Sequence, residues 1–150
     1  MGPVICCIDD SDSARHALRV GHALATRLGL EVVLLHVEPP TEAPGVSAAP
    51  AGQERLREEE LHDAESLLAR IVQETGLDPE VRRRAAIGNT AQRIVACCTD
   101  EDASLVVLGS RGRGSVASAL LGSVSSEVAA KAPCACVIVP PAAPHDLFSD

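Results

Sequence analysis

Glycine and serine residues follow one apolar segment of this chain at regular spacing. Residues 105–108 read as a buried strand, and Gly109, Gly112 and the pair Gly122-Ser123 come after it. Glycine leaves the amides of a turn open to a ligand, so the turn at Gly109 and Gly112 can bind an anion. Gly122-Ser123 opens a helix-like stretch, and the first free amides of a helix carry a partial positive charge. The two groups of amides predict a site for one phosphate chain.

Hydroxyl and guanidinium groups accompany these glycines. Ser123 and Ser125 can donate hydrogen bonds to phosphate oxygens. Arg111 and Arg113 can balance the charge of a polyphosphate, although exposed arginines after a turn are common. Each glycine alone also reads as a simple tight turn. Taken together, the positions favour phosphate contact.

Two other nucleotide motifs match the same segment only in part. Residues 109–115 approach the phosphate-loop pattern GxxxxGK[ST], but the required lysine is absent. Residues 112–117 fit the GxGxxA pattern of dinucleotide folds, yet no acidic residue follows after about 20 residues to hold a ribose. The pattern built on Gly109, Gly112, Gly122 and Ser123 uses more of the residues present than either alternative.

Composition limits the class of protein. The 150 residues predict a single domain, 1–150, and a net charge of -8 opposes nucleic-acid binding, which needs a basic face. No leader pattern and no apolar run long enough to span a membrane is present, so we expect a cytoplasmic protein. Phe148 is the only aromatic residue. Any bound base must therefore lie between aliphatic side chains.

Six cysteines occur at positions 6, 7, 97, 98, 134 and 136, and none forms the CxxC spacing usual for zinc. Cys134 and Cys136 project to the same side of a strand, which would allow a soft-metal or redox pair. Buried, reduced thiols are the favoured interpretation.

The elements that must position these residues alternate between strands and helices. Apolar runs predict strands at 4–8, 32–37, 81–87, 105–108 and 136–139, and helical spacing predicts helices at 14–28, 54–75, from 90 and from 122. This alternation indicates an α/β fold with an open five-stranded parallel sheet and helices on both faces.

Several local features follow from the same pattern. Ser11 or Ser13 can cap the first helix, which ends at Gly29. Arginines in the strand at 81–87 predict an edge position. Residues 38–53 predict a mobile loop, because they hold few large apolar groups, and residues 140–150 predict a frayed tail.

The glycine and serine residues after the fourth predicted strand make the chain resemble the universal stress protein family, in its ATP-binding branch. The family signature Gly-x2-Gly-x9-Gly-Ser/Thr is complete as Gly109, Gly112, Gly122 and Ser123. Similarity extends over nearly the whole chain, including segments 4–11, 34–37, 88–89 and 132–134. The resemblance implies a Rossmann-like fold of the adenine nucleotide alpha hydrolase-like kind and a nucleotide-dependent role in stress response or regulation.

The resemblance also implies roles for individual residues. An adenine nucleotide would lie across the carboxyl ends of the first and fourth strands, with Asp9 near the ribose and a Mg²⁺ ion, and with the backbone of Val37 meeting adenine. The positions that match phosphate contacts are Gly109, Gly112, Gly122, Ser123 and Ser125. The further expected nucleotide contacts are Ser11, Gly88, Arg111 and Val124.

One departure from the family pattern lies after the first strand. Where members commonly have Asp-Gly-Ser, this chain has Asp9-Asp10-Ser11. The second carboxylate would weaken nucleotide binding if it faced inward, or would help to hold Mg²⁺. Asp9 also reads as a cap of the first helix. The resemblance further implies a homodimer formed through the last strand, at residues 137–139.

The sequence holds no convincing catalytic set. Ser123 has no nearby histidine, and His36 reads as a strand-end residue as readily as a base. We therefore predict an ATP-binding stress protein with at most slow ATP hydrolysis and no dedicated enzymatic activity. The alternative is a nucleotide-free dimeric interaction module of the same fold. An adenylyl-transferring or ATP-pyrophosphatase enzyme ranks last, because its motifs are absent.

Overall fold

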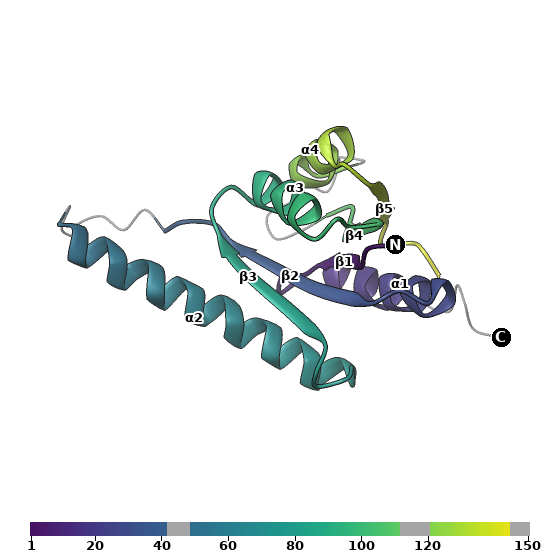
Figure 1. Ribbon diagram of the computed structural model, residues 1–150, viewed down its shortest axis with the longest axis horizontal. Helices are drawn as coiled ribbons and strands as arrows, with labels where there is room; N and C mark the ends of the chain where they lie inside the picture. The colour runs from purple at the N-terminus through teal and green to yellow at the C-terminus, as the bar shows by residue number, and fades with distance from the viewer. Residues whose placement is uncertain (42–48, 112–120, 145–150) are drawn as a thin grey trace.

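Five parallel strands form the centre of the computed structural model, which describes residues 1–41, 49–111 and 121–144 (Figure 1). The strands are β1 (Val4–Cys7), β2 (Val32–Glu38), β3 (Arg82–Ile87), β4 (Leu105–Gly109) and β5 (Ala135–Val139). The helices are α1 (Asp12–Leu28), α2 (Pro50–Thr75), α3 (Thr90–Asp100) and α4 (Ser123–Lys131). The spatial order is β3-β2-β1-β4-β5, which confirms the predicted open sheet.

The central strands are buried on both faces, which accounts for their continuous apolar runs. Ile5 of β1 pairs in register with Val33 of β2 and Val106 of β4, and all three side chains are fully buried. β3 lies at one edge of the sheet, as predicted, and begins with the exposed Arg82 and Arg83. Charged side chains on an edge strand discourage pairing with another chain.

Helices cover both faces of the sheet (Figure 1). α1 and α2 cover one face, where Leu18 and Leu68 pack with Leu34 of β2. α3 and α4 cover the other face, where Ile94 and Val128 pack with the central strands. Each helix of this second layer starts at the carboxyl edge of the sheet, so both N-termini meet there.

Helix α1 ends at Leu28 as predicted, and it begins at Asp12, two residues before the predicted range 14–28. The Ser11 hydroxyl accepts a hydrogen bond from the Ala14 amide at 3.1 Å, so Ser11, rather than Ser13, is the N-cap. Gly29 adopts a φ of 66° and ends the helix, because a left-handed backbone favours glycine.

Helix α2 begins earlier than the sequence pattern indicated. It starts at Pro50, so residues 50–53, expected to be part of the loop 38–53, are helical. Proline suits the first position of a helix because its φ is fixed and its missing amide would have no partner there. The buried residues of α2 begin only at Glu60, and its N-terminal part extends past the sheet (Figure 1).

Other parts of the expected loop and tail remain predictions. Residues 42–48 and 145–150 lie outside the described residues, as does Gly112. At the start of the expected tail, the Ala143 amide donates to the Pro140 carbonyl at 3.0 Å, and Ala143 packs against the core. In the part of the chain that the structure describes, no helix is long and apolar enough to span a membrane.

Candidate functional site

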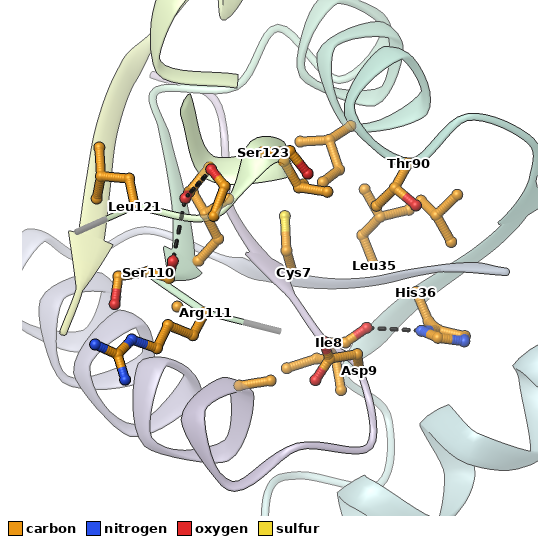
Figure 2. Close-up of a pocket in the computed structure, with 18 of the residues that line it drawn as sticks. Cys7, Ile8, Asp9, Leu35, His36, Thr90, Ser110, Arg111, Leu121 and Ser123 are labelled. Carbon is orange, nitrogen blue, oxygen red and sulfur yellow. Dashed lines mark hydrogen bonds between the residues drawn. The ribbon is translucent and has the colours of Figure 1, made fainter. Parts of the chain in front are cut away.

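A pocket of about 380 Å³ lies at the carboxyl edge of the sheet, beside the point where the strand order reverses (Figure 2). The ends of β1, β2 and β4 contribute Ile8, Leu35 and Leu108. The N-termini of α3 and α4 contribute Thr90 and Ser123. Open α/β sheets bind ligands at such a reversal, because neighbouring connections run to opposite faces there.

Most of the residues that the sequence singled out meet at this pocket, although they come from segments far apart in the chain. The predicted contacts that line it are Asp9, Val37, Gly109, Arg111, Gly122, Ser123, Val124 and Ser125. Ser11 and Gly88 do not line it. Gly112 lies outside the described residues, so its predicted contact is not tested.

The N-terminus of α4 brings backbone amides to the pocket. Gly122 is the N-cap, and no side chain caps this helix. The Gly122 amide donates to the Ser110 carbonyl at 2.8 Å, so it is not free for a ligand. Within the described residues, the amides of Ser123 and Val124 have no acceptor. These two donors, together with the helix dipole, favour a bound anion.

Ser110 and Ser125 hold the start of α4 against the sheet. The Ser110 amide donates to the Val139 carbonyl at 3.0 Å, which ties β4 to β5. The Ser125 hydroxyl donates to the carbonyls of Gly122 at 3.0 Å and Ser110 at 3.3 Å. Because its proton is used in this way, Ser125 positions the helix. The predicted contact of Ser125 with phosphate stays a prediction, and the sequence gave no indication of the role of Ser110.

Close packing explains why Gly109 and Gly122, the two glycines of the signature that the structure describes, carry no side chain. A Cβ atom on Gly109 would lie 2.6 Å from the Ser13 hydroxyl oxygen of α1 and 3.1 Å from the Arg111 carbonyl oxygen. A Cβ atom on Gly122 would lie 3.3 Å from the Ser110 carbonyl oxygen. The absence of side chains therefore lets α1 and the β4 end approach closely, in addition to leaving the backbone open.

Arg111 supplies an unused donor to the pocket. Its Nε atom is buried and has no hydrogen-bond partner among the described residues. A buried polar atom without a partner needs an explanation, and a guanidinium group binds phosphate or carboxylate oxygens strongly. Arg111 lines the same pocket as Ser123 and Val124 at the start of α4.

Asp9 lines the pocket, whereas Asp10 does not. One carboxylate oxygen of Asp9 accepts hydrogen bonds from the Ser11 amide at 2.9 Å and from the Ser11 hydroxyl. Asp9 thus supports the residue that caps α1, but it is not the cap itself. In the same arrangement, Ser11 caps α1 and does not line the pocket.

Asp10 forms ion pairs away from the pocket. Its carboxylate lies 2.9 Å from Arg15 and 3.3 Å from Arg70. Hydrogen bonds from these arginines lower the pKa of Asp10. The second carboxylate therefore joins α1 to α2 and leaves Asp9 as the acidic residue that faces the pocket.

Gly88 connects two strand ends outside the pocket. Its amide donates to the Glu38 carbonyl at 3.0 Å, and its φ of 140° is a conformation that side-chain-bearing residues rarely adopt. A Cβ atom there would also lie 2.8 Å from the Arg93 Nε atom. The backbone conformation and the contact with Arg93 therefore explain a glycine at position 88 without any ligand.

His36 is a buried connection between strand ends. Its Nδ1 atom donates to the Ile8 carbonyl at 2.7 Å (Figure 2). Its Nε2 atom lies 2.9 Å from the Glu38 carboxylate. Both ring nitrogens are used, and only 1% of the residue is exposed. The strand-end interpretation of His36 fits this geometry.

No sequence pattern indicated that several of the pocket residues belong to a site. They are Cys7, Ala14, Pro39, Thr90, Ile94, Ser110 and Leu121. The Cys7 sulfur points into the space between Leu35 and Ser123 (Figure 2). Burial and the neighbouring cysteines raise the pKa of the Cys7 thiol well above its ordinary value. The thiol therefore adds an apolar surface rather than a nucleophile.

The described ranges 1–41, 49–111 and 121–144 contain no group of three histidine, cysteine, aspartate or glutamate side chains placed to hold a metal ion. Among the described residues that line the pocket, Asp9 is the only one with a carboxylate. A divalent ion here would need further ligands from a bound anion.

Comparisons with known proteins agree with this geometry. The sequence matches the Universal stress protein family over residues 1–140. It is 33% identical over 136 residues to a universal stress protein of Thermus aquaticus, which covers 91% of this chain and 96% of that one. It is 35% identical over 129 residues to the Mycobacterium tuberculosis universal stress protein Rv2005c, but that alignment covers only 41% of the relative.

Solved structures show the same fold. The hypothetical protein MJ0577 superposes with a TM-score of 0.78 at 24% identity, covering 95% of this chain and 98% of that one. A universal stress protein in complex with cAMP gives a TM-score of 0.60 at 20% identity, with coverage of 92% and 96%. The Archaeoglobus fulgidus protein in complex with dAMP gives 0.56 at 21%, with 93% and 98%. The fold is Rossmann-like, of the nucleotide alpha hydrolase-like kind, and this chain belongs to the universal stress protein family.

Proposed function

We propose that this protein binds ATP with Mg²⁺ in the pocket at the carboxyl edge of the sheet and that it acts as a nucleotide-dependent stress or regulatory protein. One observation carries the proposal: Ser123 and Val124, whose amides have no acceptor among the described residues, line the same pocket as Arg111, whose buried Nε atom has no described partner. This combination matches the oxygens of a phosphate chain, which accept hydrogen bonds and carry negative charge.

The apolar part of the pocket suits a nucleobase. Leu35, Val37 and Ile94 line it, and no Phe, Tyr or Trp side chain lies among the described residues. An adenine ring would therefore lie against aliphatic groups, with the backbone of Val37 at the end of β2 available to its edge. The solved family members with cAMP and dAMP, both adenine nucleotides, support this choice of base.

Asp9 is the residue proposed to hold Mg²⁺. Magnesium is commonly bound by one or two carboxylates together with phosphate oxygens and water, so a single carboxylate fits a metal that arrives with the nucleotide. The ion would neutralise phosphate charge. No described residue at the pocket is placed as a general base, since His36 is buried and bonded at both nitrogens. Hydrolysis, if it takes place, is expected to be slow.

The test begins with protein purified free of nucleic acid. Because the chain has no Trp and no Tyr, it absorbs very little at 280 nm, and a band at 260 nm reports bound nucleotide directly. Acid extraction and chromatography then identify the compound. Titration calorimetry with Mg·ATP, and with ATP in chelator, measures affinity and the share that the ion contributes.

Substitutions of Ser123 separate the amide from the hydroxyl. Ser123→Pro removes the amide donor at a helix position that proline favours, and Gly122 before it already has the extended backbone that proline requires. Ser123→Ala removes only the hydroxyl. Losing one hydrogen bond to a charged group costs about 1.5–3 kcal/mol, so we expect Ser123→Pro to weaken ATP binding by roughly 10- to 150-fold.

Ser123→Ala is expected to bind within a few-fold of the parent chain. Equal ATP affinity in Ser123→Pro and the parent, with both proteins folded, would show that the α4 amides do not bind the phosphates. An absence of heat and of thermal shift with Mg·ATP in the parent would contradict the proposal as a whole.

The alternative is a nucleotide-free dimeric module. The position of β5 favours a dimer whether or not the protein binds nucleotide. β5 lies at an edge of the sheet, and its Val137 and Ile138 are only partly buried in the single chain. We propose that two chains pair along this edge. Sedimentation of the parent and of Val137→Lys tests the dimer, and ATP titration of both decides whether the nucleotide contributes to it.

A further inference from the structure

The hydrogen-bond ladder between β1 and β2 stops before β2 ends. The Ile8 amide donates to the Leu35 carbonyl at 2.8 Å. In a regular parallel ladder the next bond would run from the Val37 amide to the Ile8 carbonyl, because alternate residues of a strand bond to the same neighbour. Between these described residues that bond is absent. The two strands therefore separate at the edge of the sheet where the pocket lies.

The side chain of His36 occupies the acceptor that the ladder would use. Its Nδ1 atom lies 2.7 Å from the Ile8 carbonyl oxygen (Figure 2). Because a carbonyl oxygen only accepts hydrogen bonds, Nδ1 carries the hydrogen. On the other side of the buried ring, the Glu38 carboxylate lies 2.9 Å from Nε2 and fixes the orientation of the imidazole. The imidazole thus takes the place of the Val37 amide at this oxygen.

The backbone of Val37 is left open on the side of the pocket. The Glu38 carbonyl accepts a hydrogen bond from the Gly88 amide at 3.0 Å, on the β3 side of β2. The N–H and C=O groups of the preceding residue, Val37, therefore point to the β1 side. β1 has ended at Cys7, and Val37 lines the pocket. A backbone donor and acceptor outside the ladder need other partners, which a ligand in the pocket can supply.

We propose that His36 is a positioning residue that keeps Val37 out of the β1–β2 ladder, so that the Val37 N–H and C=O groups bind the edge of a nucleobase. His36 acts through the Ile8 carbonyl. The inference rests on the proposed binding of ATP and adds to it the residue that makes the pocket selective for the base.

A donor and an acceptor on one residue match adenine. The edge of adenine presents a ring nitrogen that accepts a hydrogen bond beside an amino group that donates one. In the same placement, hypoxanthine presents a carbonyl oxygen in place of the amino group, so the Val37 carbonyl would face a second acceptor. A site built to hydrogen-bond one group rejects an analogue that lacks it. The pocket should therefore prefer ATP to inosine triphosphate.

Amide hydrogen exchange of the full chain without nucleotide tests the backbone arrangement. In the parent, the Val37 amide should exchange faster than the Leu35 amide, which lies within the paired part of β2. His36→Leu releases the Ile8 carbonyl, so the Val37 amide should bond to it and exchange more slowly than in the parent. His36→Asn is the matched control, because its side-chain amide nitrogen lies close to the position of Nδ1. In that variant Val37 should remain open.

Titration calorimetry with Mg·ATP and with magnesium inosine triphosphate tests the selectivity. Loss of the Val37 contacts in His36→Leu should weaken ATP binding roughly 10-fold and change the affinity for inosine triphosphate much less. The ratio of the two affinities should therefore approach one. A change that only loosened the pocket would weaken both nucleotides alike and keep the ratio. His36→Asn should restore most of the preference for ATP.

Equal exchange of the Val37 amide in the parent and in His36→Leu would overturn the role of His36. An unchanged ratio of affinities would overturn it as well, while ATP binding by the parent would still stand. If the parent binds no ATP, the proposed function fails, and the exchange measurement still decides whether His36 holds Val37 open. If His36→Leu does not fold, His36→Gln replaces it in both measurements, because its longer side chain places the donor beyond Ile8, toward Glu38.

Discussion

Single residues at the pocket serve the protein framework as much as a ligand. Gly109 shows this clearly, because the position of its missing Cβ atom lies 2.6 Å from the Ser13 hydroxyl oxygen. That hydroxyl is itself buried without a hydrogen-bond partner among the described residues. The contact between α1 and the end of β4 is therefore tight and lacks a compensating polar interaction.

This contact predicts a coupled pair of substitutions. Gly109→Ala should destabilise the protein by about 1–3 kcal/mol, the usual effect of adding atoms to a packed site. Ser13→Ala alone should be close to neutral, because it removes a buried hydroxyl that has no partner. The double variant should recover part of the loss, and urea unfolding of the four proteins measures this coupling. Strict additivity would contradict the proposed contact.

At the scale of elements, α2 makes a buried polar contact near its middle. Glu60 is buried, and its carboxylate accepts a hydrogen bond from the Thr41 amide at 2.6 Å. No residue of α2 before Glu60 is buried. This hydrogen bond therefore ties the helix to the chain that leaves β2, beside Pro39 at the pocket.

Breaking that contact should loosen one segment without unfolding the sheet. Glu60→Ala is expected to lose about 1.5–3 kcal/mol from the hydrogen bond to a charged group and to accelerate hydrogen exchange at Thr41. Glu60→Gln keeps a carbonyl acceptor and should lie between the two. Unchanged exchange at Thr41 in Glu60→Ala, with β1 still protected, would show that other contacts hold this segment.

At the scale of the whole molecule, alkaline pH acts mainly through the cysteines. The chain has no Tyr, and Lys131 is its only lysine. Few other groups therefore lose a proton between neutral pH and the pKa of arginine. Burial raises the pKa of Cys6 from 9.0 to about 12. Burial also raises the pKa of Cys97, Cys98 and the other described thiols.

These shifts predict a protein that weakens as the pH rises above 9.0. There the unfolded chain releases thiol protons that the folded chain retains, so the free energy of unfolding falls. Each fully buried thiol contributes a slope of about 1.4 kcal/mol per pH unit until the pH passes its folded pKa. Urea unfolding under reductant between about pH 7.5 and about pH 10.5 measures the slope.

Cys6→Ala provides the matched control for this prediction. This substitution removes one titrating thiol. The free energy of unfolding should therefore fall less steeply with pH above 9.0, by the contribution of one thiol. Stability that is independent of pH in the parent chain would show that the thiols are as ionisable in the folded protein as in the unfolded one.

The sequence alone determined the architecture, and it singled out residues that line the candidate site. Apolar runs of strand length that alternate with helical periodicity permit few arrangements, because buried parallel strands and their covering helices require those patterns. Gly109, Gly122 and Ser123, which their spacing singled out, line the pocket, because the end of a central strand and the start of a covering helix lie at the same edge of the sheet. The start of α2 was the main local error, since Pro50 extends a helix into residues with little apolar periodicity.

Only the tertiary structure decided what the individual side chains do. It turned Asp10 toward Arg15 and Arg70, and it gave the Ser125 hydroxyl to backbone carbonyls. Periodicity fixes which face of an element is buried, but the partner of a polar side chain depends on elements distant in the sequence. Such contacts exist only after the helices have packed on the sheet, and no local pattern records them.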